Sequence, residues 1–170
     1  MLVTNKAGAA WRHKLFAFLM MWTVLQFMLV FCRTPIGFIS DETLYKRIAY
    51  SLFQFKPALS WHYPILYPFL ISSGFFFGRY FYEAMLIVNI LFKGICLLVI
   101  WKLLKRTIDD ERRAFYALIL IGFSPIYFLY SRVLFAENLA CPLLIINVLY
   151  HEVYRQKLID ENATFRNKLR

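Results

Sequence analysis

Charged side chains are scarce in this sequence, and several long stretches have none. Of its 170 residues, 18% are charged, whereas 61% are hydrophobic and 19% are aromatic. A soluble domain is about half apolar and about a quarter charged, and it could not cover this much apolar surface. The scarcity of charge excludes an ordinary soluble domain. It indicates an all-α membrane protein whose spanning helices are flanked by clusters of Lys and Arg.

Cysteine and histidine are also few. The three cysteines lie within or at the end of apolar runs: Cys32, Cys96 and Cys141. Their odd number and wide spacing argue against a disulfide framework. The three histidines are far apart, and no pair of His or Cys residues has the spacing of metal ligands. The sequence therefore predicts neither a metal site nor a cofactor.

What the sequence does contain is four apolar segments. We predict membrane-spanning helices at residues 15–32, 82–104, 114–130 and 136–150. The first carries no charge and is long enough to cross a hydrocarbon core of about 30 Å. It exceeds the core of a signal peptide, and the CRTPIG that ends it is a poor cleavage site. The predicted architecture is a polytopic helix bundle, with one transmembrane domain over residues 1–150 and a polar tail at 151–170.

The positions of Lys and Arg predict the orientation of these spans. With the N-terminus in the cytoplasm, 13 basic residues fall inside and six fall outside, in agreement with the positive-inside rule. Both termini and the tail are then cytoplasmic, and residues 33–81 form a long outer loop. The net charge of +10 is explained by topology and by contacts with anionic lipid headgroups. It does not indicate a nucleic-acid partner.

Residues 63–78, YPILYPFLISSGFFFG, are apolar enough to suggest a fifth crossing. The segment is short, with Pro64 and Pro68 early and Gly74 and Gly78 late. A fifth crossing would also reverse every later loop and place the basic run KLLKR outside. We therefore predict an interfacial or re-entrant helix at the outer face.

The first part of the outer loop, ISDETLYKRIAYSLFQF, has the periodicity of an amphipathic helix lying along the membrane surface. Asp41 and Glu42 suit the positive N-terminal end of its dipole. Lys46 follows Glu42 by four residues, as in many surface ion pairs. The predicted apolar stripe of this helix is Leu44, Ile48, Leu52 and Phe55. On spacing alone, helix capping explains the acidic pair without any catalytic role.

The order of these features resembles a known superfamily. An uncharged first span is followed by Asp41-Glu42 at the start of a surface helix, then by HYPILYPFL and a second span. This order is similar to the GT-C membrane glycosyltransferases, which include protein O-mannosyltransferases and bacterial lipid A aminoarabinose transferases. The resemblance covers residues 15–150. It implies transfer of a sugar from a polyprenyl- or dolichyl-phosphate donor to an acceptor hydroxyl at the outer face, with inversion at the anomeric carbon.

The resemblance also implies roles for individual residues. Asp41 would be the general base that deprotonates the acceptor hydroxyl, and Glu42 would be a supporting acid. Basic residues near the acidic pair would bind the donor phosphate. The implied substrate-binding residues are Tyr45, Lys46, Arg47, His62, Tyr63, Arg132, Glu137 and Asn138.

Two other functions stay open at this point. One is a non-catalytic membrane interaction protein, and the other is a small transporter subunit with Lys93 lining its pathway. Lys93 lies near the middle of the second predicted span, where a charge is costly. The structural alternative is pairing with Asn89 or with a carboxylate on a helix missing from this sequence. Gln26 and Asn147 are predicted to hydrogen-bond between helices. The tryptophans are predicted to lie mostly at the membrane interfaces.

The GT-C enzymes have more than four spans. We therefore expect this chain to be the N-terminal part of such an enzyme, incomplete by itself, which acts with a partner chain or a further C-terminal segment. Membrane lipids are expected partners as well. The absence of eukaryotic targeting signals in the sequence favours a bacterial plasma membrane.

Overall fold

The computed structural model describes residues 3–31, 39–57 and 64–168, and within these ranges the chain forms helices and connecting turns without a strand. This confirms the predicted all-α class. The helices are α1 (Val3–Phe31), α2 (Ile39–Phe53), α3 (Leu66–Ser72), the 3₁₀ helix η1 (Ser73–Tyr80), α4 (Phe81–Thr107), α5 (Glu111–Gly122), α6 (Pro125–Tyr130) and α7 (Glu137–Lys168).

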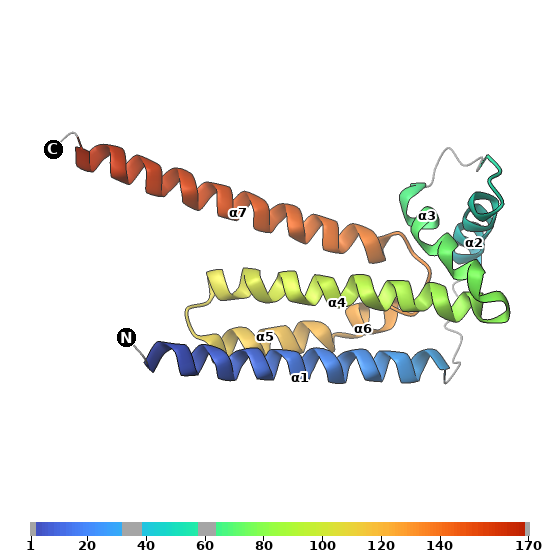
Figure 1. Ribbon diagram of the computed structural model, residues 1–170, viewed down its shortest axis with the longest axis horizontal. Helices are drawn as coiled ribbons and strands as arrows, with labels where there is room; N and C mark the ends of the chain where they lie inside the picture. Colours follow the sequence, from blue (N-terminus) through green and yellow to red (C-terminus); the bar gives the residue numbers. More distant parts are fainter. Residues whose placement is uncertain (1–2, 32–38, 58–63, 169–170) are drawn as a thin grey trace.

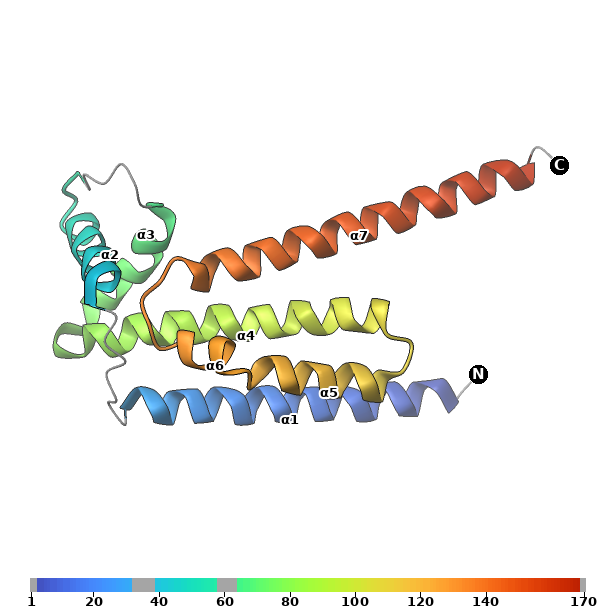
Figure 2. The ribbon, with the colours of Figure 1, turned by 180° about the vertical axis from the view of Figure 1, so that it is seen from behind.

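The long helices α1, α4 and α7 run along the longest axis of the molecule, and α5 lies beside α1 and α4 (Figures 1 and 2). Both termini lie at one end, and α2 and α3 lie at the other end. The chain therefore passes along this axis four times. Helix α4 is central, because it contacts α1, α5 and α7.

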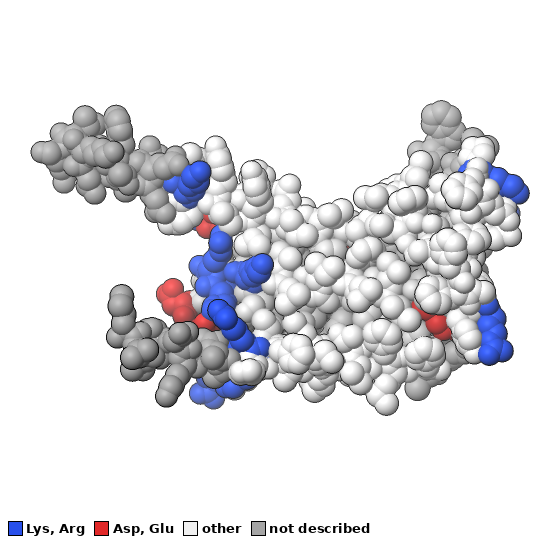
Figure 3. Space-filling model, viewed as in Figure 1, with Lys and Arg blue, Asp and Glu red and all other residues white. Residues whose placement is uncertain are grey.

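Two described segments, Trp11–Phe31 and Leu66–Thr107, are long and apolar enough to cross a membrane. The third and fourth predicted spans coincide with α5–α6 and with the first half of α7. Helix α5 alone has 12 residues, or about 18 Å at the rise of an α-helix. The bilayer crossings of these two segments stay predictions. On the face shown in Figure 3, a broad belt without charged side chains separates two charged ends.

The segment from Leu66 to Tyr80 folds back against α4. A Cβ atom added at Gly74 would lie 2.8 Å from the carbonyl oxygen of Phe81 and 2.7 Å from Cγ of Met85. A straight helix would separate positions 74 and 85 by about 16 Å, so the chain must turn between them. It does so at Gly78, whose φ of 56° and ψ of −118° suit glycine. Residues 66–80 therefore lie near α2 rather than extending α4.

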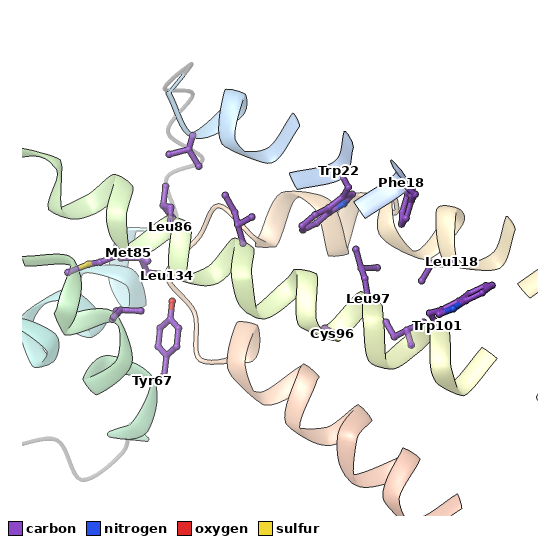
Figure 4. Close-up of a cluster of buried hydrophobic side chains, with 14 of the residues drawn as sticks. Phe18, Trp22, Tyr67, Met85, Leu86, Cys96, Leu97, Trp101, Leu118 and Leu134 are labelled. Atoms are coloured by element: carbon purple, nitrogen blue, oxygen red, sulfur yellow. The ribbon is translucent and has the colours of Figure 1, made fainter. Parts of the chain in front are cut away.

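Trp22 lies in the core between α1, α4 and α5, although the sequence predicts that the tryptophans lie mostly at the membrane interfaces. Trp22 is fully buried, and its Nε1 donates a hydrogen bond to the carbonyl oxygen of Gly122 at 2.9 Å. Figure 4 shows Phe18 and Trp22 of α1 gathered with Leu97 and Leu118. The prediction of an interfacial Trp22 was wrong, because one indole here both fills the core and satisfies a carbonyl at the end of α5.

Polar side chains also join the helices. The Nε2 atom of Gln26 donates to the carbonyl oxygen of Phe128 at 3.0 Å, and Ser131 Oγ donates to Gln26 Oε1 at 2.8 Å. These bonds tie α1 to the end of α6 and confirm the predicted role of Gln26. Asn147 is exposed on α7. Trp101, also predicted at an interface, is buried near the other end of the core.

Helix α2 forms where the sequence predicts it, but a different face is buried. Its buried residues are Glu42, Tyr45, Ile48 and Ala49. The predicted stripe was wrong at Phe55, which is 99% exposed, follows the end of the helix and has a φ of 56°. The buried face thus contains a carboxylate. The contacts of the Glu42 carboxylate explain its burial.

Candidate functional site

The acidic pair at the start of α2 has two distinct environments. Asp41 is exposed, whereas Glu42 is only 7% exposed. The hydroxyl of Tyr82, in the first turn of α4, donates a hydrogen bond to Oε1 of Glu42. A buried carboxylate requires such a partner. One acid is therefore fixed by the fold, and its neighbour faces outward.

Lys46 lies one turn along α2 from Glu42 and contacts the same tyrosine. Its Nζ lies 5.1 Å from the centre of the Tyr82 ring, within the range of a cation–π interaction. Lys46 therefore lies beside the buried face of α2, although it is not part of the predicted apolar stripe. The ring of Tyr82 holds an ammonium group close to the carboxylate that its hydroxyl binds. Arg47, in contrast, is exposed.

A second set of contacts connects α2 with the turn between α6 and α7. The rings of Tyr45 and Tyr67 meet edge to face at 5.3 Å. The Tyr67 hydroxyl, which points from α3 toward α4 in Figure 4, donates to Oδ1 of Asn89 at 2.9 Å. Asn89 Nδ2 in turn donates to the carbonyl oxygen of Val133 at 3.0 Å. Tyr45 is thus a buried packing residue at the start of this chain of contacts.

The same carbonyl receives a second bond from the start of α7. Asn138 is fully buried, and its Nδ2 donates to the Val133 oxygen at 2.7 Å. Its Oδ1 accepts no hydrogen bond from the described residues. Two asparagines therefore hold the α6–α7 turn, which carries the half-buried Arg132 and is followed by the exposed Glu137 at the start of α7. The turn is fixed at the same end of the molecule as α2 and α3 (Figure 1).

The structure therefore brings together two regions that the sequence reading treated separately. One region is α2, which carries Asp41, Glu42, Tyr45 and Lys46. The other is the α6–α7 turn with Arg132 and the start of α7 with Glu137 and Asn138, and it is linked to α2 through Tyr67 and Asn89. The predicted site residues His62 and Tyr63 lie outside the described residues. Their positions relative to the acidic pair stay predictions.

Sequence reasoning missed two residues beside the acidic pair, Tyr82 and Glu83. Tyr82 holds Glu42, and the buried Glu83 lines an apolar groove of about 570 Å³ together with Phe31, Gly74 and Phe77. The sequence does contain a signal for these residues. Tyr82-Glu83 stands at the start of an apolar run, where a buried acid needs a hydrogen-bond partner. The groove lies between the end of α1, η1 and the first turns of α4.

Lys93 lies away from these contacts. Its side chain is 4% exposed, and its Nζ lies 4.5 Å from the centre of the Tyr127 ring. The Tyr127 hydroxyl donates to the carbonyl oxygen of Lys93 at 2.7 Å. Asn89, the predicted partner, instead bonds to Tyr67 and Val133. The surroundings of Lys93 therefore favour a structural cation–π contact between α4 and α6.

Comparison with known proteins identifies the family. The family described as dolichyl-phosphate-mannose-protein mannosyltransferase matches residues 62–157, which is more than half of the chain. No curated protein and no solved structure matches. The matched region begins after α2, so it contains Tyr82 and the α6–α7 turn but not the acidic pair. The match agrees with the resemblance seen in the sequence. The chain belongs to the dolichyl-phosphate-mannose-protein mannosyltransferase family, and it is an integral membrane protein of the glycosyltransferase type.

Proposed function

We propose that the chain supplies the acidic site of a glycosyltransferase that transfers a sugar from a polyprenyl phosphate to an acceptor hydroxyl at the non-cytoplasmic face of the membrane. The observation that carries this proposal is the asymmetry of the acidic pair. Asp41 is exposed, while Glu42 is buried and bound by Tyr82. Two adjacent carboxylates in such different environments suit two different roles.

Asp41 is the general base in this proposal. The acceptor hydroxyl gives its proton to the Asp41 carboxylate as its oxygen bonds to the anomeric carbon of the sugar. The bond between that carbon and the phosphate oxygen breaks at the same time, and the polyprenyl phosphate leaves with the electron pair. A single displacement of this kind inverts the anomeric centre.

The leaving phosphate gains negative charge, and the site has basic residues that can stabilise it. Lys46 is held near the acidic pair by the ring of Tyr82. Arg47 lies on the same helix, and Arg132 lies on the turn fixed by Asn89 and Asn138. Hydrogen bonds between such cations and a phosphate are stronger than neutral ones, and they matter most where charge develops.

The family supports the donor class. Its description names a dolichyl-phosphate-linked mannose and a protein acceptor. A lipid-linked donor also fits a site at the end of a bundle of apolar helices, because the sugar then stays near the membrane surface. The alternative of a transporter subunit rested on Lys93, whose contact with Tyr127 accounts for its burial.

Donor dependence tests this function. The chain, purified from its native membranes in mild detergent with the proteins that accompany it, should transfer radiolabelled mannose from mannosyl-phosphoryl-polyprenol to a serine- and threonine-containing peptide. Nucleotide-linked mannose should give no product, because it has no lipid carrier. Equal transfer from the nucleotide sugar, or transfer from neither donor, would refute the proposal.

Tyr82→Phe should lower the transfer rate about tenfold or more without reducing the amount of protein in the membrane. The substitution removes one hydrogen bond to a buried carboxylate, a bond typically worth about 1.5–3 kcal/mol, and keeps the ring that Lys46 contacts. Tyr80→Phe is the matched control, since Tyr80 is exposed two positions earlier. Unchanged transfer by Tyr82→Phe would show that Glu42 does not need this partner.

A further inference from the structure

Helix α7 lies at the edge of the bundle, and no described helix covers one of its faces. It contacts mainly α4, and both ribbon views show α4 on one side of α7 and no helix on the opposite side (Figures 1 and 2). The residues on the α4 side are buried or half-buried, and they recur at the spacing of one helix face. They include Asn138, Cys141, Pro142, Ile145, Leu149 and Glu152.

The opposite face of α7 is exposed, and Asn147 lies at its centre. At about 100° per residue, position 147 is turned about 200° from Ile145 and so points away from α4. The exposed residues of this face are Ala140, Leu143, Leu144, Asn147, Tyr150 and Tyr154, with His151 beside them. Between positions 140 and 154 the charged residue is Glu152, which lies on the α4 side. The exposed face there is therefore without Asp, Glu, Lys or Arg.

Asn147 stands where an exposed amide is costly. It follows Glu137, at the start of α7, by ten residues, or about 15 Å along the helix. In the predicted crossing of residues 136–150, this depth is the middle of a hydrocarbon core of about 30 Å. The Asn147 side chain makes no hydrogen bond with the described residues. An amide without a partner is unfavourable in hydrocarbon.

The polar side chains of the other apolar helices are treated differently. Gln26, Asn89 and Lys93 are each at most 4% exposed, and Gln26 and Asn89 have hydrogen-bond partners on other elements. The exposed face of α1 within its apolar run is formed by apolar residues, among them Phe16, Met20, Val24 and Met28. Asn147 departs from this pattern, which indicates a polar partner outside the chain.

The face around Asn147 also has the spacing of a helix-pairing surface. Ala140, Asn147 and Tyr154 follow one another at intervals of seven residues. Leu143 and Tyr150 each lie three residues after a member of this series. Contact positions repeat in this way when two helices pair with a left-handed crossing, which is also the common packing in membranes. A single amide at such a position fixes the register of the pair.

We propose that this face of α7 pairs with the same face of a second copy of the chain, and that the two Asn147 amides bind each other. An amide both donates and accepts hydrogen bonds, so it complements itself. The Lys and Arg distribution that orients one copy orients the other in the same way. The two α7 helices then run parallel, and a two-fold axis along the membrane normal places the two Asn147 side chains side by side. Ala140 is small enough to let the helices approach closely.

Energy transfer between labelled copies tests this pairing. The whole chain, labelled at its N-terminus with a donor or an acceptor dye and reconstituted in phosphatidylcholine vesicles, should show more transfer than random proximity gives, and the transfer should fall on dilution with lipid. Asn147→Leu should weaken the association about tenfold, because it removes the hydrogen bonds between the helices. Asn147→Gln keeps an amide and should associate like the parent. Ile146→Ala, at an exposed neighbour outside this face, is the control and should also associate like the parent.

Cross-linking in native membranes locates the interface. In a chain whose native cysteines are replaced by alanine, Leu143→Cys and Tyr150→Cys should give covalent dimers on oxidation with copper phenanthroline. Ile145→Cys and Leu149→Cys lie on the α4 side and should stay monomeric.

Three results would overturn the proposal. One is energy transfer at the random level at every protein density, which would assign the face to a helix of another protein. Another is an Asn147→Leu variant that associates as tightly as the parent. The third is equal cross-linking from positions 143 and 145. Asn147 has no part in the acidic site, so these results do not depend on the transferase proposal.

Discussion

Asn in place of Asp41 should lower the rate of sugar transfer at least a hundredfold while the chain accumulates normally in the membrane. The amide cannot accept the proton of the acceptor hydroxyl, and general base catalysis contributes about 10²–10⁴-fold to such reactions. Asp41 is exposed in the first turn of α2, so the isosteric change removes little packing. The expected loss is therefore chemical rather than structural.

The measurement is the initial rate of transfer in membranes from cells whose native copy carries the substitution. Asp109→Asn is a matched control, because Asp109 is also an exposed aspartate but lies in the turn between α4 and α5. It should transfer at the parental rate. A variant at position 41 that keeps half of the parental rate would remove Asp41 from the mechanism.

The fold could be predicted to the extent that local sequence determines it. Long apolar runs predicted the helices α1 and α4, and the position of Asp41 and Glu42 predicted the start of α2 within two residues. The third predicted span was less regular than expected, because α5 ends at Gly122 and α6 begins at Pro125. Proline lacks the donor that would continue a helix, and Ser124 caps the new one.

The site was less predictable, because its contacts connect distant parts of the chain. Spacing placed Asp41 and Glu42 together, but it could not show which of them is buried. That depends on Tyr82, 40 positions away. The burial of Asn138 likewise depends on the carbonyl of Val133 and its second partner, Asn89. Periodicity reports which residues share a helix face, but not which neighbouring helix lies against that face.

Trp22 illustrates the same limit in the core. Tryptophan in a membrane protein is commonly interfacial, and the sequence around Trp22 contains nothing that contradicts this expectation. Its burial follows from the carbonyl of Gly122, one hundred positions away, which accepts its indole N–H. A pattern based on composition therefore predicted an apolar helix here correctly and the role of this residue incorrectly.

The arrangement of the helices gives a second prediction with a large effect, which concerns sidedness. Helices α2 and α3 lie at one end of the molecule, and the α4–α5 turn and both termini lie at the other. Cysteines placed at these two ends should therefore react with a membrane-impermeant maleimide from opposite sides of the membrane. The difference should be nearly all-or-none, because the reagent does not cross the bilayer.

The central claim is that Asp41 faces the non-cytoplasmic side, and this labelling experiment tests it most directly. In a chain whose three native cysteines are replaced by alanine, Asp41→Cys and Phe55→Cys should react in intact cells or spheroplasts. Lys105→Cys and His151→Cys should react only after the membrane is opened. Reaction of position 41 only after opening, or reaction of positions 41 and 105 from the same side, would contradict the account.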